Sequence, residues 1–157
     1  MSWNTALLAL ALGLCAAFAT ACQSRPPAQW IDATVEAPSD NLLWDVTVLS
    51  LQKTGFPLGT GLDRNKLTAL SGWNAQLAPF RTDGYRERAY VQYTSQGNRK
   101  YGVKVRVERE INQDISHPLD LSYAEWEPDR DNVTRAQILL GYIKATLGPR
   151  LEMAEPK

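Results

Sequence analysis

Thiol chemistry is the first chemistry that this sequence offers, because its two cysteines lie close together near the N-terminus. Cys15 is inside an apolar run over residues 6–18, and Cys22 directly follows the small residues Ala19-Thr20-Ala21. An apolar run that ends in small residues is typical of a cleaved secretory signal, which we place at residues 1–21. Removal of this signal leaves Cys22 as the sole thiol, so the mature chain cannot form an internal disulfide.

The placement of Cys22 after Ala19-Thr20-Ala21 resembles the lipobox of bacterial lipoproteins. The resemblance implies that Cys22 is acylated with fatty acids such as palmitate, becomes the first residue and anchors the chain to a membrane. Asp after the cysteine often signals retention in the inner membrane in that family, whereas Gln23 stands here. The resemblance therefore implies an outer-membrane anchor and a domain that faces the periplasm. The alternative is an ordinary secretory signal with Cys22 left as an unmodified thiol.

The single histidine, His117, is the obvious candidate for general acid–base chemistry. A catalytic triad would need a nucleophile and a carboxylate placed by the fold, and the nearby Ser116 and Ser122 do not stand in a nucleophile-elbow pattern. We therefore expect a solvated loop histidine and assign no catalytic residue and no cofactor.

Carboxylates are concentrated between Asp114 and Asp131. Asp129 and Asp131 alternate as at the start of a calcium-binding loop, but the required glycine is missing and Leu140 stands where the last ligand belongs, so we expect no metal site. A pair of these acids across a cleft could instead hydrolyse an envelope component. A cell-envelope hydrolase is thus the alternative function.

Basic residues dominate the stretch just before this acidic one, although the formal net charge of the whole chain is zero. Alternation along two expected strands brings four cations to one sheet face: Arg86, Arg88, Lys104 and Arg106. We predict that they form a binding surface for an envelope protein, an anionic envelope component or the acidic loop of the same chain. The alternative is a solvated face on which Glu87, Glu108 and Glu110 neutralise the cations. The exported location disfavours nucleic acid as a partner.

Capping and turn residues predict where the helices and strands that position these residues begin and end. A helix should begin at Ser39 or Asp40 and end at the left-handed cap Thr54-Gly55-Phe56. A second helix should follow Asp131 or Asn132 and end at Gly148-Pro149. Three strands are expected at about 67–73, 86–94 and from residue 100, with a hairpin turn over 95–98.

We therefore predict an α+β fold made of a helix, a three-stranded antiparallel sheet and a C-terminal helix, with both helices on one sheet face. Residues 22–38 are expected to be a linker that Pro26-Pro27 stiffens so that it holds the domain off the bilayer, 39–150 a single domain, and 151–157 a flexible tail. The connection from Asn112 to Arg130 should pack through Leu119, Leu121, Tyr123 and Trp126. The aromatic core candidates are Trp44, Trp73, Tyr85, Tyr101, Trp126 and Tyr142.

This layout resembles small uncharacterised bacterial lipoproteins, which are similar in turn to the BamC-type helix-grip domain of the outer-membrane β-barrel assembly machinery. The segments that carry the resemblance are Trp44, Thr54-Gly55-Phe56, Gly72-Trp73, Pro79-Phe80-Arg81, residues 84–89 and residues 103–107. The resemblance implies a lipid-anchored domain that binds or scaffolds at the cell envelope and is not an enzyme.

Overall fold

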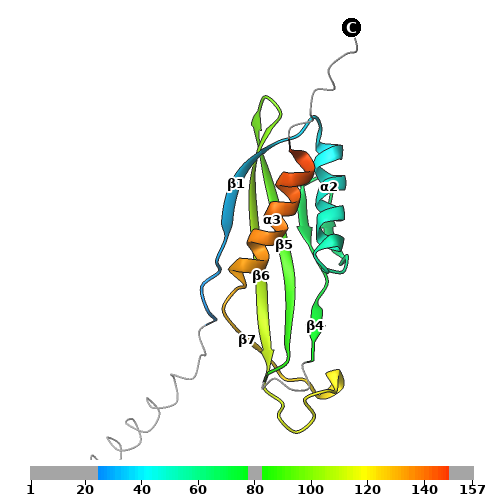
Figure 1. Cartoon of the computed structure of the whole chain (residues 1–157), viewed down its shortest axis with the longest axis vertical. Coiled ribbons are helices and arrows are strands. Elements are labelled where there is room, and N and C mark those ends of the chain that lie inside the picture. Colours follow the sequence, from blue (N-terminus) through cyan, green and yellow to red (C-terminus); the bar gives the residue numbers. More distant parts are fainter. Residues whose placement is uncertain (1–24, 78–82, 149–157) are drawn as a thin grey trace, which may run out of the picture.

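The computed structural model describes residues 25–77 and 83–148 of the chain, so Cys22, the signal and the tail lie outside it (Figure 1). The described residues contain seven strands and two α-helices. In order they are β1 (Ile31–Glu36), α2 (Asp40–Lys53), β2 (Gly61–Asp63), β3 (Thr68–Leu70), β4 (Asn74–Gln76), β5 (Tyr85–Gly97), β6 (Lys100–Asn112), the 3₁₀ turn η2 (Leu121–Tyr123), β7 (Trp126–Pro128) and α3 (Val133–Leu147).

The described residues form one antiparallel sheet of seven strands in the order β1-β6-β5-β3-β2, with β4 also paired to β5 and β7 to β6. The α+β class is therefore right, but the prediction of three strands is wrong. Three of the additional strands, β2, β4 and β7, contain only three residues each, which is too short to leave an alternating pattern in the sequence.

The sheet is built around the long hairpin of β5 and β6, which contain 13 residues each. Gly97, Asn98 and Arg99 all have positive φ in its turn, where we expected the chain to reverse. Tyr101, Val103, Val105 and Val107 alternate towards the core, opposite Ala89, Val91 and Tyr93 of β5. This alternation gives the sheet one apolar inner face and one polar outer face.

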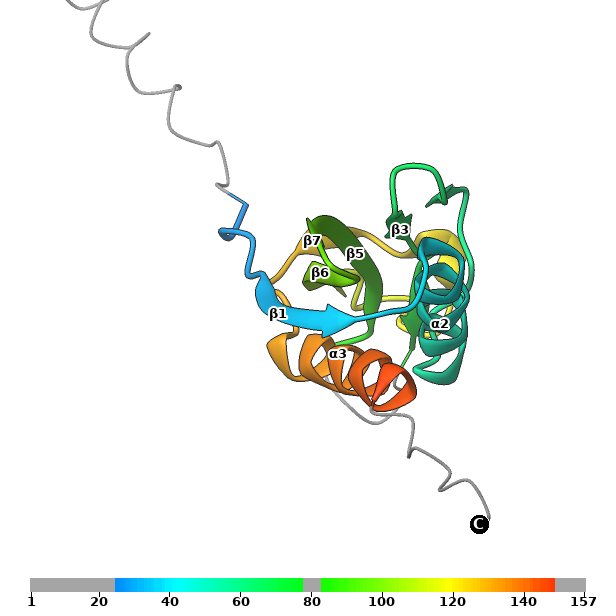
Figure 2. The same ribbon diagram turned by 90° about the horizontal axis from the view of Figure 1, so that it is seen from above.

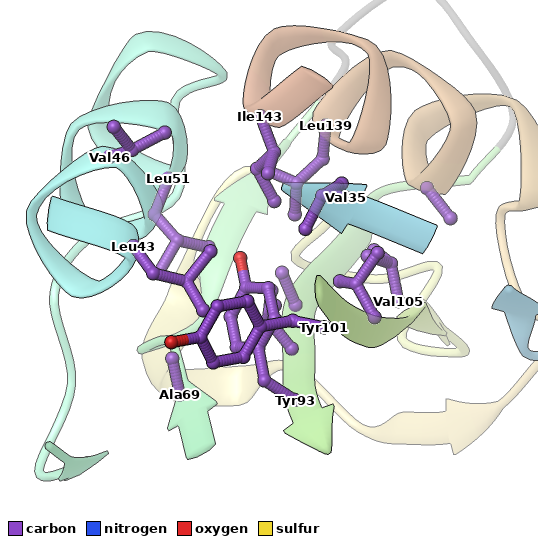
Figure 3. Packing of buried hydrophobic residues seen from close by; sticks show 14 of the residues in the cluster. Val35, Leu43, Val46, Leu51, Ala69, Tyr93, Tyr101, Val105, Leu139 and Ile143 are labelled. Atoms are coloured by element: carbon purple, nitrogen blue, oxygen red, sulfur yellow. The ribbon is translucent and has the colours of Figure 1, made fainter. Parts of the chain in front are cut away.

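Both helices pack on the inner face (Figures 1 and 2). Leu43, Val46 and Leu51 of α2 and Leu139 and Ile143 of α3 meet the valines of the sheet in one core, in which Val35 of β1 also takes part (Figure 3). The two helices also contact each other. Neither α-helix of the described residues covers the outer face of the sheet.

The caps of α2 lie where the sequence predicts them. The Ser39 hydroxyl accepts a hydrogen bond from the Leu42 amide, and the cap at the other end places Gly55 at φ +82°. The amides of Gly55 and Phe56 donate to the carbonyls of Gln52 and Leu51. This double closure satisfies the last carbonyls of the helix, and it buries Phe56 against the core.

The folded unit begins earlier than we predicted. Residues 31–36 belong to β1, which pairs with β6 from Ile31 opposite Val105 to Glu36 opposite Lys100, so a linker extending to residue 38 is wrong. The strand was missed because only Ile31, Ala33 and Val35 face inwards, a pattern too short to separate from a Pro-rich linker.

Four of the six aromatic core candidates also lie elsewhere. Tyr85 is partly buried and stacks on the Arg109 guanidinium. Tyr142 is exposed on α3, while Trp73 and Trp126 are partly buried and stack on arginines of the outer face. An aromatic ring can cover a guanidinium as well as fill a core, so residue type alone did not separate the two roles.

Candidate functional site

The outer face of the sheet gathers most of the predicted binding residues. Arg86, Arg88 and Tyr90 of β5 stand directly opposite Glu110, Glu108 and Arg106 of β6. Residues in direct register on one sheet face interact side by side, so the hairpin places each of two arginines against a glutamate.

The three arginines are held in short ion pairs. Arg86 donates to Glu110 at 2.6 Å, and Arg88 donates to Glu108 at 2.6 Å. Arg106 makes a two-pronged contact with Asp131, at 2.6 and 3.1 Å, and Asp131 directly precedes the cap of α3. Fork-like contacts of this kind fix both the position and the orientation of the guanidinium.

Aromatic rings cover the same guanidinium groups. The Arg86 guanidinium carbon lies 4.4 Å from the ring centre of Trp73 and 4.8 Å from that of Trp126. Arg88 lies 4.3 Å from Trp73 and 5.3 Å from Tyr90, and Arg106 lies 5.5 Å from Tyr90. We call this continuous stack the outer ladder; its members are Trp126, Arg86, Trp73, Arg88, Tyr90 and Arg106. Each stacked and paired cation is thereby shielded from water.

Lys104 differs in its surroundings from the three arginines of the predicted binding surface. It is exposed, and no carboxylate of the described residues pairs with it within 4.0 Å. Beside it lies a shallow hollow of about 340 Å³ that crosses β1, β6 and β5; its lining residues include Asp32, Thr34, Thr94, Gln96, Gly102 and Lys104. The hollow lies beside Gly102, which has no side chain, and both polar and apolar groups line it, Ala33 and Val103 among the latter.

The segment before β1 lies against the outer ladder. Arg25 contacts Glu108 in an ion pair and reaches to 4.0 Å from Glu110. The Gln29 amide donates to Asp131 at 2.6 Å, and Trp30 meets the edge of Tyr90 with ring centres 6.2 Å apart. Residues 25–30 therefore contact the domain on both sides of Pro26-Pro27 and do not extend away from it, while the distance from the bilayer stays a prediction.

Two acids of the Asp114–Asp131 connection, Asp114 and Asp120, accept hydrogen bonds from the backbone of the same connection. Asp114 accepts from the amides of Ser116 and His117, and these bonds, with Ser116 first, lower the pKa of Asp114. Asp120 accepts from the hydroxyl and amide of Ser122, and the pKa of Asp120 is lowered mainly by this hydroxyl. A general acid needs the opposite shift, so these two carboxylates do not suit that role.

His117 is half exposed, lies 3.4 Å from Asp114 and stacks on Tyr123 with ring centres 4.3 Å apart. Among the described contacts, neither the Ser116 hydroxyl nor the Ser122 hydroxyl forms a hydrogen bond with the His117 ring. Within residues 25–77 and 83–148, no three His, Cys, Asp or Glu side chains group as a metal site would require.

No protein-family model matches the chain, and no curated protein matches it significantly. None of the helices in the described part of the chain has the length and apolar character to cross a membrane. The candidate site must therefore be interpreted from its own geometry.

Sequence reasoning placed Arg86, Arg88, Lys104 and Arg106 on one face, and the structure brings them there. Of the three acids named as neutralising them, Glu108 and Glu110 do so, but Glu87 faces the core side and bonds to Asn132 at 2.7 Å. Asp131 belongs to the acidic stretch that we considered as a partner of this face, and it pairs with Arg106. The residues not assigned to this face from the sequence are Arg25, Trp73 and Trp126. The hairpin register could have paired the arginines with the glutamates, whereas these three residues come from distant segments.

Proposed function

We propose that this protein is a lipid-anchored protein of the bacterial outer membrane whose domain faces the periplasm and acts by binding or scaffolding. Acylated Cys22 is its membrane anchor in this proposal. The layout of two helices on one face of an antiparallel sheet is consistent with the resemblance to the BamC-type helix-grip domain.

The contact between Arg25 of the linker and Glu108 of β6 is the observation that supports this proposal most directly. Arg25 stands three residues after Cys22 and is bound to Glu108, whose side chain is only 2% exposed. Three residue steps span at most about 11 Å, so an acyl chain on Cys22 keeps the domain at the membrane surface. In a linker that made no contact with the domain, an arginine would not be paired with a buried carboxylate.

The proposed contact surface for a partner is the outer face at Lys104. The three arginines of the predicted surface already have carboxylate and aromatic partners, which leaves Lys104 and the hollow beside it as the accessible part. An envelope protein with acidic side chains, or an anionic envelope component, fits this charge.

The anchor is tested by feeding cells an alkyne-labelled fatty acid and isolating the full chain. We expect label on the wild type and none on Cys22→Ser, which should also leave the membrane fraction. Equal labelling of both chains, or of neither, contradicts the proposal.

The contact surface is tested by cross-linked pull-down from detergent-solubilised envelopes with Lys104→Glu. Reversal of Arg86 or Arg106 is unsuitable, because Glu there would face Glu110 or Asp131 and disturb the fold. Arg130→Glu, a reversal at another exposed cation, is the matched control. We expect partners recovered by the wild type and the control to be lost with Lys104→Glu; full recovery with Lys104→Glu excludes this surface.

A further inference from the structure

The loop between β6 and β7, residues 113–125, exposes a series of apolar side chains. Ile115 is 87% exposed, Leu119 58%, and both Leu121 and Tyr123 56%. We expected three of these side chains to pack inwards, and that expectation is wrong. Several large apolar side chains exposed together in one loop mark an interaction surface.

The loop is held in shape by its own polar side chains. Its base is closed by Asn112, whose side-chain oxygen accepts from the amides of Asp114 and Glu125 at 3.0 Å each. Asp114 and Asp120 fix two further turns through the amides of Ser116 and Ser122. The apolar side chains are thus presented outwards by an ordered backbone.

Figure 1 shows the loop at the lower end of the β5–β6 hairpin and the segment before β1 in the lower half of the molecule. Arg25 reaches Glu110, and the loop begins three residues after Glu110, about 10 Å further along β6. Cys22 can lie no more than about 11 Å from Arg25. The proposed anchor is therefore joined, through at most three residue steps, to the part of β6 that leads into the exposed apolar loop.

We propose that residues 113–125 insert their apolar side chains into the headgroup region of the bilayer beside the acylated Cys22. This inference depends on the anchor of the proposed function. An apolar surface that an anchor holds at a bilayer gains free energy by entering the boundary between headgroups and acyl chains. Acids of the same loop, among them Asp114 and Asp120, make zwitterionic lipid a better host than anionic lipid.

The test uses the full-length gene product, purified with its acyl chains and reconstituted into phosphatidylcholine vesicles. A spin label on Ile115→Cys reports from the loop, and the same label on Ser95→Cys reports from the opposite end of the hairpin. Acylation blocks the Cys22 thiol, so each chain carries one label. We expect accessibility to a water-soluble nickel reagent to be about tenfold lower at 115 than at 95.

A matched variant separates insertion from other shielding. Leu119→Ser/Leu121→Ser in the Ile115→Cys chain should restore nickel accessibility at 115, while phosphatidylglycerol in the vesicles should raise it partly. Both leucines are exposed, so folding should be retained. Leu119→Cys repeats the measurement should the label at 115 disturb the loop.

The outcomes distinguish the two proposals. An acylated, vesicle-bound chain with equal nickel accessibility at 115 and 95 overturns the loop insertion and leaves the anchor intact. A chain that mass spectrometry finds unacylated, with both labels accessible, overturns both. Shielding at 115 that survives Leu119→Ser/Leu121→Ser also overturns insertion by this loop.

Discussion

Glu108 and Arg88 face each other across the β5–β6 hairpin, joined by a 2.6 Å hydrogen bond, and the Glu108 side chain is almost completely buried. Glu108 also accepts from the Tyr90 hydroxyl at 2.9 Å and contacts Arg25. One carboxylate thus joins the hairpin to the linker.

Glu108→Gln should lower the free energy of unfolding by about 2 kcal/mol, because it removes the charge that Arg88 and Arg25 share. Urea unfolding monitored by circular dichroism measures this change. Glu36→Gln, at an exposed glutamate of β1, should change the stability by less than about 0.5 kcal/mol. A similar small change for both variants would mean that the buried charge contributes little.

Trp73→Ala should destabilise the domain by about 2–3 kcal/mol, since the ring covers both Arg86 and Arg88 and buries apolar area of its own. Trp73→Phe should recover part of this loss, since a smaller ring can still stack on the two guanidinium groups. Thermal unfolding of the two variants gives the comparison. Tyr142→Ala, an exposed aromatic on α3, is the control and should cost under about 1 kcal/mol.

Arg25→Ala should release the linker while the core stays folded. The Gln29 amide, which donates to Asp131, should then exchange its hydrogen with solvent at least about tenfold faster. Hydrogen exchange followed by NMR measures this amide, and the amides of β6 report on the core. Arg64→Ala, which removes an exposed cation near Asp45, should leave the Gln29 rate unchanged.

Alkaline pH should destabilise the domain through Tyr93. Burial raises the pKa of Tyr93 to about 12, while its hydroxyl contacts Thr47 at 2.6 Å. Because the folded pKa exceeds the unfolded value of about 10, this contribution is complete below pH 10 and is lost as the pH rises towards 12. The loss should amount to roughly 2–3 kcal/mol.

Urea unfolding between pH 8 and pH 12 checks this dependence. Tyr93→Phe should flatten it, although the pKa of Tyr101, raised mainly by its hydrogen bond to Asp40, leaves a residual slope in the same direction. Tyr123→Phe, an exposed tyrosine, should retain the full slope. Equal slopes in all three proteins would rule out Tyr93 as the source.

The sequence predicted the elements whose signals are local. Ser39 and Gly55 mark the two ends of α2, and the valines of β6 indicate which side of this strand faces the core. Both signals depend only on neighbours a few residues away. The site was only half predictable. Strand alternation placed Arg86 and Arg106 on the outer face, and the acidic loop that contains Asp131 was a possible partner for Arg106. Trp73, which covers Arg86, comes from a distant segment that no local pattern connects to β5.

The fastening of the linker has a mechanical consequence. A pull on the N-terminal segment loads the side-chain contacts of Arg25 and Gln29 before it loads the backbone ladder between β1 and β6. Those contacts can open while the core remains folded, which frees the nine residue steps from Cys22 to Ile31. The maximum distance between Cys22 and the first residue that the domain holds then rises from about 11 Å, at Arg25, to about 30 Å, at Ile31. The linker therefore has two maximum lengths, and the tension on the N-terminal segment determines which of them applies.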